Sequence, residues 1–404
     1  MIKHELDCIA QFYGAVINDD APDTFYFSVK LKKEVNSEIL QKAVDELIIR
    51  LPHLNGQLEN GFLRNYIKVL NKPLLIKKKE KPTTFARCHK KGRDSMFRVY
   101  YESNHITVET THLICDGRSL AKIAISLLAR YFELLGVNVT RGDLINFADT
   151  LKKEEIEDVF AKHLRDADPK EKTAIFKRYT ERQKEINKDN YLHGQSTPST
   201  ARVVSKTFDA EKVKASAKEH NATVSELILA NIFKILKEER DKKGNKKAIT
   251  IALPVDYRSF FPSETLLTFV QGKVITMPET DDMGKMIEAI KLQVKDITKD
   301  YVYEDIIGFA SVINMMHYLP LPLKKLLFRA AKPAGYSTMF SNLGLIRLPT
   351  EIESFVESVE FAICPESNKE AYSFCCATTA NALVVTVSMA VEGVDGFING
   401  FEIE

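Results

Sequence analysis

The stretch Thr111-His112-Leu113-Ile114-Cys115-Asp116-Gly117 places a histidine, an aspartate and a glycine in the pattern His-x-x-x-Asp-Gly. Before the aspartate, one face of an extended segment carries Ile106, Val108, Thr110, His112 and Ile114. After it, residues recur at helical spacing, namely Leu120, Ile123, Ala124, Leu127, Leu128, Tyr131 and Leu135, and Gly136 stands where a C-terminal cap belongs. The motif therefore predicts a strand-to-helix junction.

The histidine of this junction is a candidate general base. An imidazole near the end of a rigid strand is held in place close to a cleft, as a base must be. A lone histidine among apolar neighbours is more often a structural residue, so its position alone does not show that His112 is catalytic. Asp116 can pair with a cation to fix the turn, and Gly117 admits a close backbone approach. Cys115 is not expected to be a nucleophile, because its side chain would alternate away from His112 along a strand.

The motif from His112 to Gly117 resembles the active-site signature of the superfamily that includes chloramphenicol acetyltransferase, nonribosomal peptide condensation domains and alcohol acyltransferases. Three further segments resemble that superfamily in the order it requires. They are Ala43 to Leu58, which ends in Arg50-Leu51-Pro52, then Leu253-Pro254-Val255-Asp256-Tyr257-Arg258 with Phe261 to Thr265 behind it, and Ser341-Asn342-Leu343-Gly344. The last segment is similar to the bacterial alcohol acyltransferase branch.

The resemblance implies an α+β fold, an α/β sandwich of two chloramphenicol acetyltransferase-like subdomains that form a pseudo-dimer with a tunnel between them. The sequence divides accordingly. Residues 1–190 would form the N-terminal subdomain with the motif, residues 191–201 read as a polar linker, and residues 202–404 would form the C-terminal subdomain.

Local patterns support sheets and helices in both halves. Alternation predicts a strand from Phe25 to Leu31, followed by a helix capped near Asn36 or Ser37, and Asn60-Gly61 predicts a hairpin. In the second half, Asp209 opens one helix and the Thr223/Glu226 spacing caps another. Strands are predicted at Arg202 to Phe208, Ala248 to Val255, Gly272 to Met277, Val359 to Ile363, Ala371 to Thr378 and Leu383 to Val391.

The resemblance also implies roles for the site residues. His112 would deprotonate the acceptor, Asp116 would form a structural ion pair with Arg258, and Gly117 would permit tight packing of strand and helix. Ser341 is the candidate oxyanion donor, with a turn serine as the equally weighted alternative and with Thr378 and Tyr336 as weaker candidates. Condensation domains usually carry a second histidine where this chain has Thr111. That difference places the chain nearer to the stand-alone acyltransferases.

Composition is compatible with an enzyme and excludes some partners. The 404 residues are 45% hydrophobic, enough for two cores of ordinary size. A net charge of +2 gives no indication of the strongly basic character that is typical of nucleic-acid-binding proteins. The six cysteines lack metal-site spacing, so we expect reduced thiols and no metal. The chain shows neither a signal-peptide pattern nor a run of eighteen apolar residues. We expect a cytoplasmic monomer that does not bind membranes.

The functional hypothesis is an acyltransferase that moves an acyl group from a thioester to an alcohol or amine acceptor. The co-substrate would be acyl-coenzyme A or the phosphopantetheine thioester of an acyl-carrier protein, and no cofactor would be bound permanently. The alternative is a non-catalytic relative of condensation domains that only binds a carrier protein or a ligand. A structural partner in a larger assembly is the third possibility.

Overall fold

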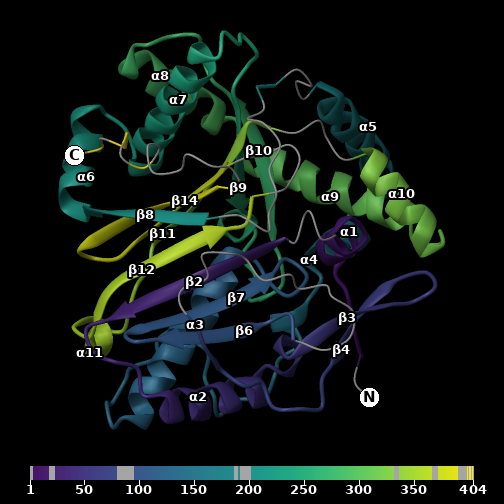
Figure 1. The fold of residues 1–404 in the computed structure, drawn as a ribbon. Coiled ribbons are helices and arrows are strands. Elements are labelled where there is room, and N and C mark those ends of the chain that lie inside the picture. The colour runs from purple at the N-terminus through teal and green to yellow at the C-terminus, as the bar shows by residue number, and fades with distance from the viewer. Residues whose placement is uncertain are drawn as a thin grey trace.

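The computed structural model describes residues 3–17, 23–79, 95–185, 190–191, 202–331, 336–365 and 372–389, together with 398, 400, 401 and 403. Two large sheets are stacked, with helices on their outer sides and a further group of helices along one side (Figure 1). This arrangement confirms the α+β class.

The first large sheet has the strand order β12-β2-β7-β6-β5. Its strands are β12 (Val356–Ile363), β2 (Thr24–Leu31), β7 (His105–Thr111), β6 (Arg98–Glu102) and β5 (Lys77–Lys78). Alternate residues of β2, such as Phe25 and Phe27, are buried in the same core as α2 (Ser37–Arg50) and α3 (Gly117–Leu134). The predicted cap is confirmed, because the Asn36 side chain accepts the Ile39 N–H at the start of α2.

The second large sheet has the order β10-β9-β11-β13-β14-β8. Its strands are β10 (Val270–Thr276), β9 (Thr250–Asp256), β11 (Thr338–Leu345), β13 (Tyr372–Thr378), β14 (Ala382–Met389) and β8 (Arg202–Asp209). The helices α6 (Ala210–Glu219), α7 (Val224–Lys242) and α8 (Met283–Lys295) pack against it. The predicted caps are confirmed, since Asp209 caps α6 and Thr223 with Glu226 forms a capping box on α7.

A third group of elements lies along one side of both sheets. Its helices are α1 (Cys8–Val16), α4 (Val159–Asp166), α5 (Pro169–Glu185), α9 (Lys299–Met315) and α10 (Leu321–Ala331). A small sheet of order β1-β4-β3 accompanies them, formed by β1 (Lys3–Glu5), β4 (Asn65–Val69) and β3 (Gly56–Asn60). Residues from both halves of the chain share the core of this group, among them Ile9, Phe160, Tyr257 and Phe309.

Four short helical elements complete the part of the chain that the structure describes. Three are single 3-10 turns, at η1 (Pro52–Leu54), η2 (Glu154–Ile156) and η4 (Tyr257–Ser259). The fourth is the four-residue helix α11 (Thr350–Glu353), which precedes β12.

One strand of the second half belongs to the first sheet. β12 pairs antiparallel with β2, where Phe361 lies opposite Phe27, and the two ribbons lie side by side in Figure 1 although their colours come from opposite ends of the chain. The Thr386 hydroxyl on β14 also donates to the Phe361 carbonyl at 2.6 Å, which ties this strand to the second sheet. The two sheets therefore do not coincide with the two halves of the sequence, and the predicted domain boundaries remain a prediction.

The structure shortens one predicted strand, confirms one hairpin and leaves the predicted linker untested. The strand of the motif ends at Thr111, because the N–H groups of Ile114 and Cys115 both donate to the Thr111 carbonyl and turn the chain. The Asn60-Gly61 hairpin is confirmed, but its loop runs to Arg64, whose carbonyl accepts the Gly61 N–H. The predicted linker lies outside the described residues except for Tyr191.

The described cysteines are buried and form no disulfide, at Cys8, Cys115, Cys364, Cys375 and Cys376, and Cys88 lies outside the described residues. In the described part of the chain, no helix has the length and apolar character that crossing a bilayer requires. Over the same residues, no group of three or more histidine, cysteine or acidic side chains could hold a metal ion.

Candidate active site

The predicted strand-to-helix junction is confirmed. β7 ends at Thr111, a turn covers His112 to Ile114, and α3 begins at Gly117. Asp116 is the N-cap of α3, and its Oδ1 atom accepts the Ser119 N–H at 2.8 Å. A side-chain acceptor at this position satisfies one of the N–H groups that a helix start leaves without a partner. The aspartate of the motif therefore fixes the start of the helix.

The backbone of His112 is held from two directions. Its N–H donates to the Asp23 carboxylate at 3.1 Å, and its carbonyl accepts the Thr268 hydroxyl at 3.1 Å. Asp23 has a positive φ of 50°, a conformation that costs free energy for a residue with a side chain. Because Asp23 precedes β2 and Thr268 comes from the second half, tertiary contacts fix the position of the histidine.

The ring of His112 packs against two aromatic rings. Tyr13 of α1 stacks on it at a centroid distance of 5.0 Å and an interplanar angle of 18°. Phe25 of β2 lies at 4.6 Å with a tilt of 39°. His112 as a whole residue is half-buried. Stacking of this kind orients the imidazole without using the carboxylate of the motif.

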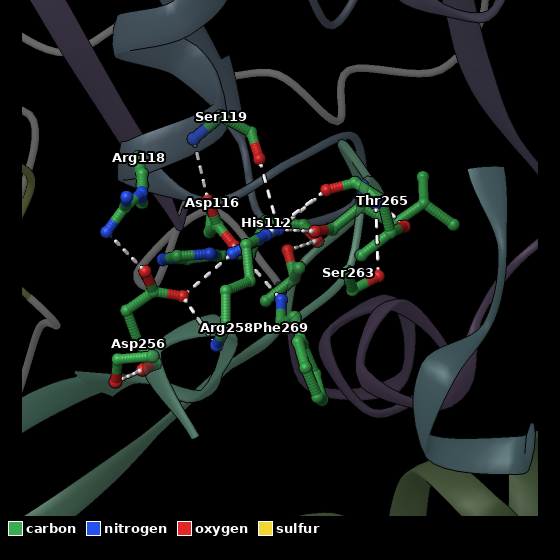
Figure 2. A network of polar contacts seen from close by, with 12 residues as sticks. His112, Asp116, Arg118, Ser119, Asp256, Arg258, Ser263, Thr265 and Phe269 are labelled. Carbon is green, nitrogen blue, oxygen red and sulfur yellow. Dashed lines mark hydrogen bonds and ion pairs between the residues drawn. The ribbon is translucent and has the colours of Figure 1, made fainter. Parts of the chain in front are cut away.

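The Asp116 carboxylate forms an ion pair with Arg258, as the resemblance implies. Arg258 Nη1 lies 2.7 Å from Asp116 Oδ2, and the same oxygen accepts the Phe269 N–H at 3.0 Å. Asp116 is fully buried, and the Arg258 side chain is 11% exposed. The two residues are 142 positions apart in the sequence. Figure 2 shows the pair surrounded by polar partners.

The remaining guanidinium N–H groups of Arg258 also have acceptors. Nη1 reaches Asp256 Oδ1 at 3.0 Å, and Nη2 reaches the Ser119 hydroxyl at 3.2 Å. The Thr265 and Leu267 carbonyls accept from Nη2 at 2.9 and 2.8 Å, and the Thr265 carbonyl also accepts from Nε at 3.2 Å. The planar guanidinium of an arginine has five N–H donors in fixed directions, so it can serve this set of acceptors better than the ammonium group of a lysine.

The ionisation of the pair follows from this geometry. Burial by itself raises the pKa of Asp116, but the Arg258 charge and the N–H donors of Phe269 and Ser119 outweigh it, so the pKa lies below its ordinary value. Burial would lower the pKa of Arg258, but Asp116 and Asp256 raise it. Asp116 is therefore a charged scaffold residue at neutral pH and not a proton donor.

Gly117 is required by close packing, as predicted. A Cβ atom built on Gly117 would lie 2.8 Å from the Phe361 ring of β12 and 3.2 Å from the Leu343 side chain of β11. Real Cβ atoms are essentially never found at the shorter distance. The glycine allows the start of α3 to approach two strands from the second half of the chain.

Ser341 lies on β11 and is buried, with 7% of its surface exposed. It pairs with Cys375 of β13, whose side chain belongs to the core of the first sheet, so both residues face that sheet. Leu343, two residues further along β11, contacts Gly117. Ser341 thus points toward the layer that holds the motif. Of the weaker candidates, Thr378 ends β13 opposite Leu345, and Tyr336 lies before β11 and is half-buried.

The structure therefore brings His112, Asp116, Gly117 and Arg258 into one site, and the role of Ser341 remains a prediction. Sequence reasoning did not single out the residues that hold the histidine and the ion pair: Tyr13, Asp23, Phe25, Asp256, Thr268 and Phe269. Thr265 and Asp256 do lie within the segments that carry the resemblance. The others have no local signal, because their contacts join distant parts of the chain.

Comparison with solved structures identifies the fold. The first condensation domain of the CDA synthetase superimposes with a TM-score of 0.64 at 13% identity, over 98% of this chain and 93% of that chain. The fold is that of the condensation domains. The trichothecene 15-O-acetyltransferase from Fusarium sporotrichioides gives a TM-score of 0.64 at 12% identity, over 98% and 93% of the two chains. Polyketide synthase associated protein 5 from Mycobacterium tuberculosis gives 0.62 at 13%, over 99% and 97%.

These likenesses confirm the chloramphenicol acetyltransferase-like, condensation-domain fold predicted from the motif. At identities of this size they show the fold alone. Neither a family model nor a curated protein matches the sequence. The alcohol acyltransferase branch and the tunnel between subdomains therefore remain predictions.

Proposed function

We propose that this chain is an acyltransferase that moves an acyl group from a thioester to an alcohol or amine acceptor, with His112 as the general base. The observation that carries the proposal is the His112 imidazole, which Tyr13 and Phe25 orient and which two backbone hydrogen bonds hold beside the Asp116–Arg258 pair. The likeness of the fold to an acetyltransferase and to condensation domains supports it.

The chemistry assigns one step to each group. His112 takes the proton from the acceptor hydroxyl or amine while the acceptor oxygen or nitrogen attacks the thioester carbonyl carbon. The tetrahedral intermediate carries a negative oxygen, for which the Ser341 hydroxyl is our proposed donor. When the intermediate collapses, the carbon–sulfur bond breaks and the leaving thiolate receives the proton from the imidazolium. No acyl group is attached to the protein, and Asp116 exchanges no proton.

Release of free thiol from a panel of acyl-coenzyme A and acyl-carrier-protein donors, each with alcohol and amine acceptors, tests the proposal. We expect turnover with at least one pair, and His112→Ala should lower it by about 10² to 10⁴-fold, the usual contribution of a positioned base. The control is His220→Ala, which changes an exposed histidine of the second half. Unchanged turnover in His112→Ala contradicts the proposal, and saturable thioester binding without transfer would support the non-catalytic alternative.

The oxyanion donor is tested separately. Ser341→Ala should lower kcat by about 10²-fold or more with little change in KM, because the hydroxyl would act on charge that develops during the reaction. Thr378→Val serves as the competing variant. If Thr378→Val lowers kcat and Ser341→Ala does not, the oxyanion donor is Thr378.

A further inference from the structure

The 3-10 turn η4 directs two consecutive side chains to different partners. Arg258 reaches Asp116 at the start of α3. Tyr257, its neighbour, is 1% exposed and donates its hydroxyl to Asp305 Oδ2 of α9 at 2.5 Å. Burial raises the pKa of Tyr257, and the Asp305 charge raises it further, so the phenol keeps its proton and acts as the donor.

Asp305 joins this turn to a second helix. Its other oxygen, Oδ1, accepts from Arg182 Nη2 of α5 at 2.8 Å, and the Asp305 side chain is 8% exposed. The Arg182 guanidinium also lies 4.2 Å from the centre of the Tyr301 ring. A buried carboxylate is costly unless charge and hydrogen bonds compensate it, and here each oxygen has a partner from a different element.

Tyr257 also contacts the other partner of Asp116. The Tyr257 N–H donates to the Phe269 carbonyl at 3.1 Å, and the two rings meet edge to face at 5.8 Å. The Phe269 N–H in turn donates to Asp116 Oδ2. Both groups bonded to that oxygen, the Arg258 guanidinium and the Phe269 N–H, are thus connected to the position of Tyr257.

We propose that Asp305 is a positioning residue for the active site, which acts through the Tyr257 hydroxyl on Arg258 and Phe269 and thereby sets the geometry of Asp116. This inference rests on the proposed function for its catalytic consequence, but its geometric consequence is independent of any substrate. The helix α5 takes part in this positioning, because its Arg182 side chain donates a hydrogen bond to the second oxygen of Asp305.

Hydrogen exchange of single amides in the full chain tests this inference. The reporters are the Phe269 and Ser119 N–H groups, which both donate to Asp116. Tyr257→Phe removes only the hydroxyl, and Asp305→Asn keeps the shape of the side chain. We expect either variant to speed exchange of both amides about fivefold, which is the effect of losing one typical hydrogen bond.

Arg178→Gln is the matched control. Arg178 also joins α5 to α9, through Glu304 at 2.7 Å, but no hydrogen bond or ion pair joins it to Asp305. We expect unchanged exchange at both amides in this variant. Equal acceleration in Arg178→Gln and Tyr257→Phe would overturn the inference, because docking of α5 as a whole would then be responsible. Unchanged exchange in both Tyr257→Phe and Asp305→Asn would also overturn it.

Asp305→Asn decides the outcome if Tyr257→Phe does not fold. Where thiol release is measurable, we expect both variants to lower kcat about fivefold with KM unchanged, since the reacting groups are displaced and the acceptor contacts are kept. Absence of thiol release from the unmodified chain would count against the proposed function alone, because the exchange of Phe269 and Ser119 is measured without substrate.

Discussion

Two buried aspartates begin helices in this protein and have opposite electrostatic surroundings. Asp116 caps α3 and Asp7 caps α1, each by accepting the N–H of the residue three positions later. The pKa of Asp116 lies below its ordinary value. The pKa of Asp7 lies well above it, because burial and the neighbouring Asp158 charge outweigh the N–H groups of the cap.

Capping and ionisation therefore have separate causes. The cap depends on residues within one helical turn and is the same at both sites. Ionisation depends on the nearest charge from elsewhere in the chain, which is Arg258 for Asp116 and Asp158 for Asp7. Among the described residues, Asp7 forms no ion pair with a cation. The motif aspartate is therefore distinguished by its distant partner and not by its local role.

Removal of the cation should have the largest effect. Arg258→Gln leaves the Asp116 carboxylate buried without a counter-charge, and we expect a loss of about 3–5 kcal/mol in the free energy of unfolding. Urea denaturation at pH 7 measures it. The control is Arg118→Gln, which removes an exposed ion pair to Asp256 and should cost less than about 1 kcal/mol. Similar losses in the two variants would mean that the buried ion pair of Asp116 stabilises the chain no more than an exposed ion pair does.

Asp116→Asn should rank second. The amide keeps one acceptor for the cap but loses the oxygen that serves both Arg258 and Phe269, so we expect a loss of about 2–3 kcal/mol. The double variant with Arg258→Gln should cost clearly less than the sum of the two single losses, as coupled partners do. Simple additivity in urea denaturation would show that the two residues do not stabilise each other.

The residue after the aspartate is a second difference between the two helix starts. Cys8 follows Asp7, whereas Gly117 follows Asp116 and lies against Phe361. Gly117→Ala should destabilise the chain by about 1–3 kcal/mol through overpacking. Gly272→Ala is the control, since a Cβ atom there meets nothing within 4 Å. Thermal unfolding of the two variants measures the difference, and an equal shift in Tm would contradict the close approach of α3 and β12.

Asp7→Asn should have the smallest effect and the opposite sign. A raised folded-state pKa means that Asp7 contributes stability at low pH, below its unfolded pKa, and that this contribution is lost as the pH rises through the folded pKa. The amide caps α1 without a charge, so we expect Asp7→Asn to be more stable than the unmodified chain at pH 8, on the order of 1 kcal/mol, and equal to it near pH 3.

Urea denaturation at the two pH values measures this difference. Asp116 provides the contrast, because its lowered pKa gives stability that is present at neutral pH and lost as the pH falls through the folded pKa. A lower stability of Asp7→Asn at pH 8 would mean that the Asp7 carboxylate is favourably paired.

Much of the fold was readable from local patterns. The caps at Asn36, Asp209 and Thr223 were predicted because each acts on N–H groups within three residues. Phe25 and Phe27 identified β2 through alternation. The pairing of Asp116 with Arg258 came from a resemblance between motifs, and no periodicity could have supplied it, since 142 positions separate the two residues.

Other features had no local signal. The strand of the motif ended earlier than its alternation suggested, because the turn after Thr111 is made by backbone hydrogen bonds that any sequence can form. The pairing of β12 with β2 in the first sheet depends on the free edge of β2, and this edge forms only when the first sheet has folded. The stacking of Tyr13 on His112 depends on where α1 docks.

Neighbours along the chain and a recognisable motif were sufficient to predict the junction at His112 to Gly117 and the class of the fold. The folded structure was needed to show which strands pack against Gly117, which groups keep Asp116 charged and how the histidine ring is oriented. Each of those depends on a group from a distant segment, and its distance is set by packing that local periodicity does not describe.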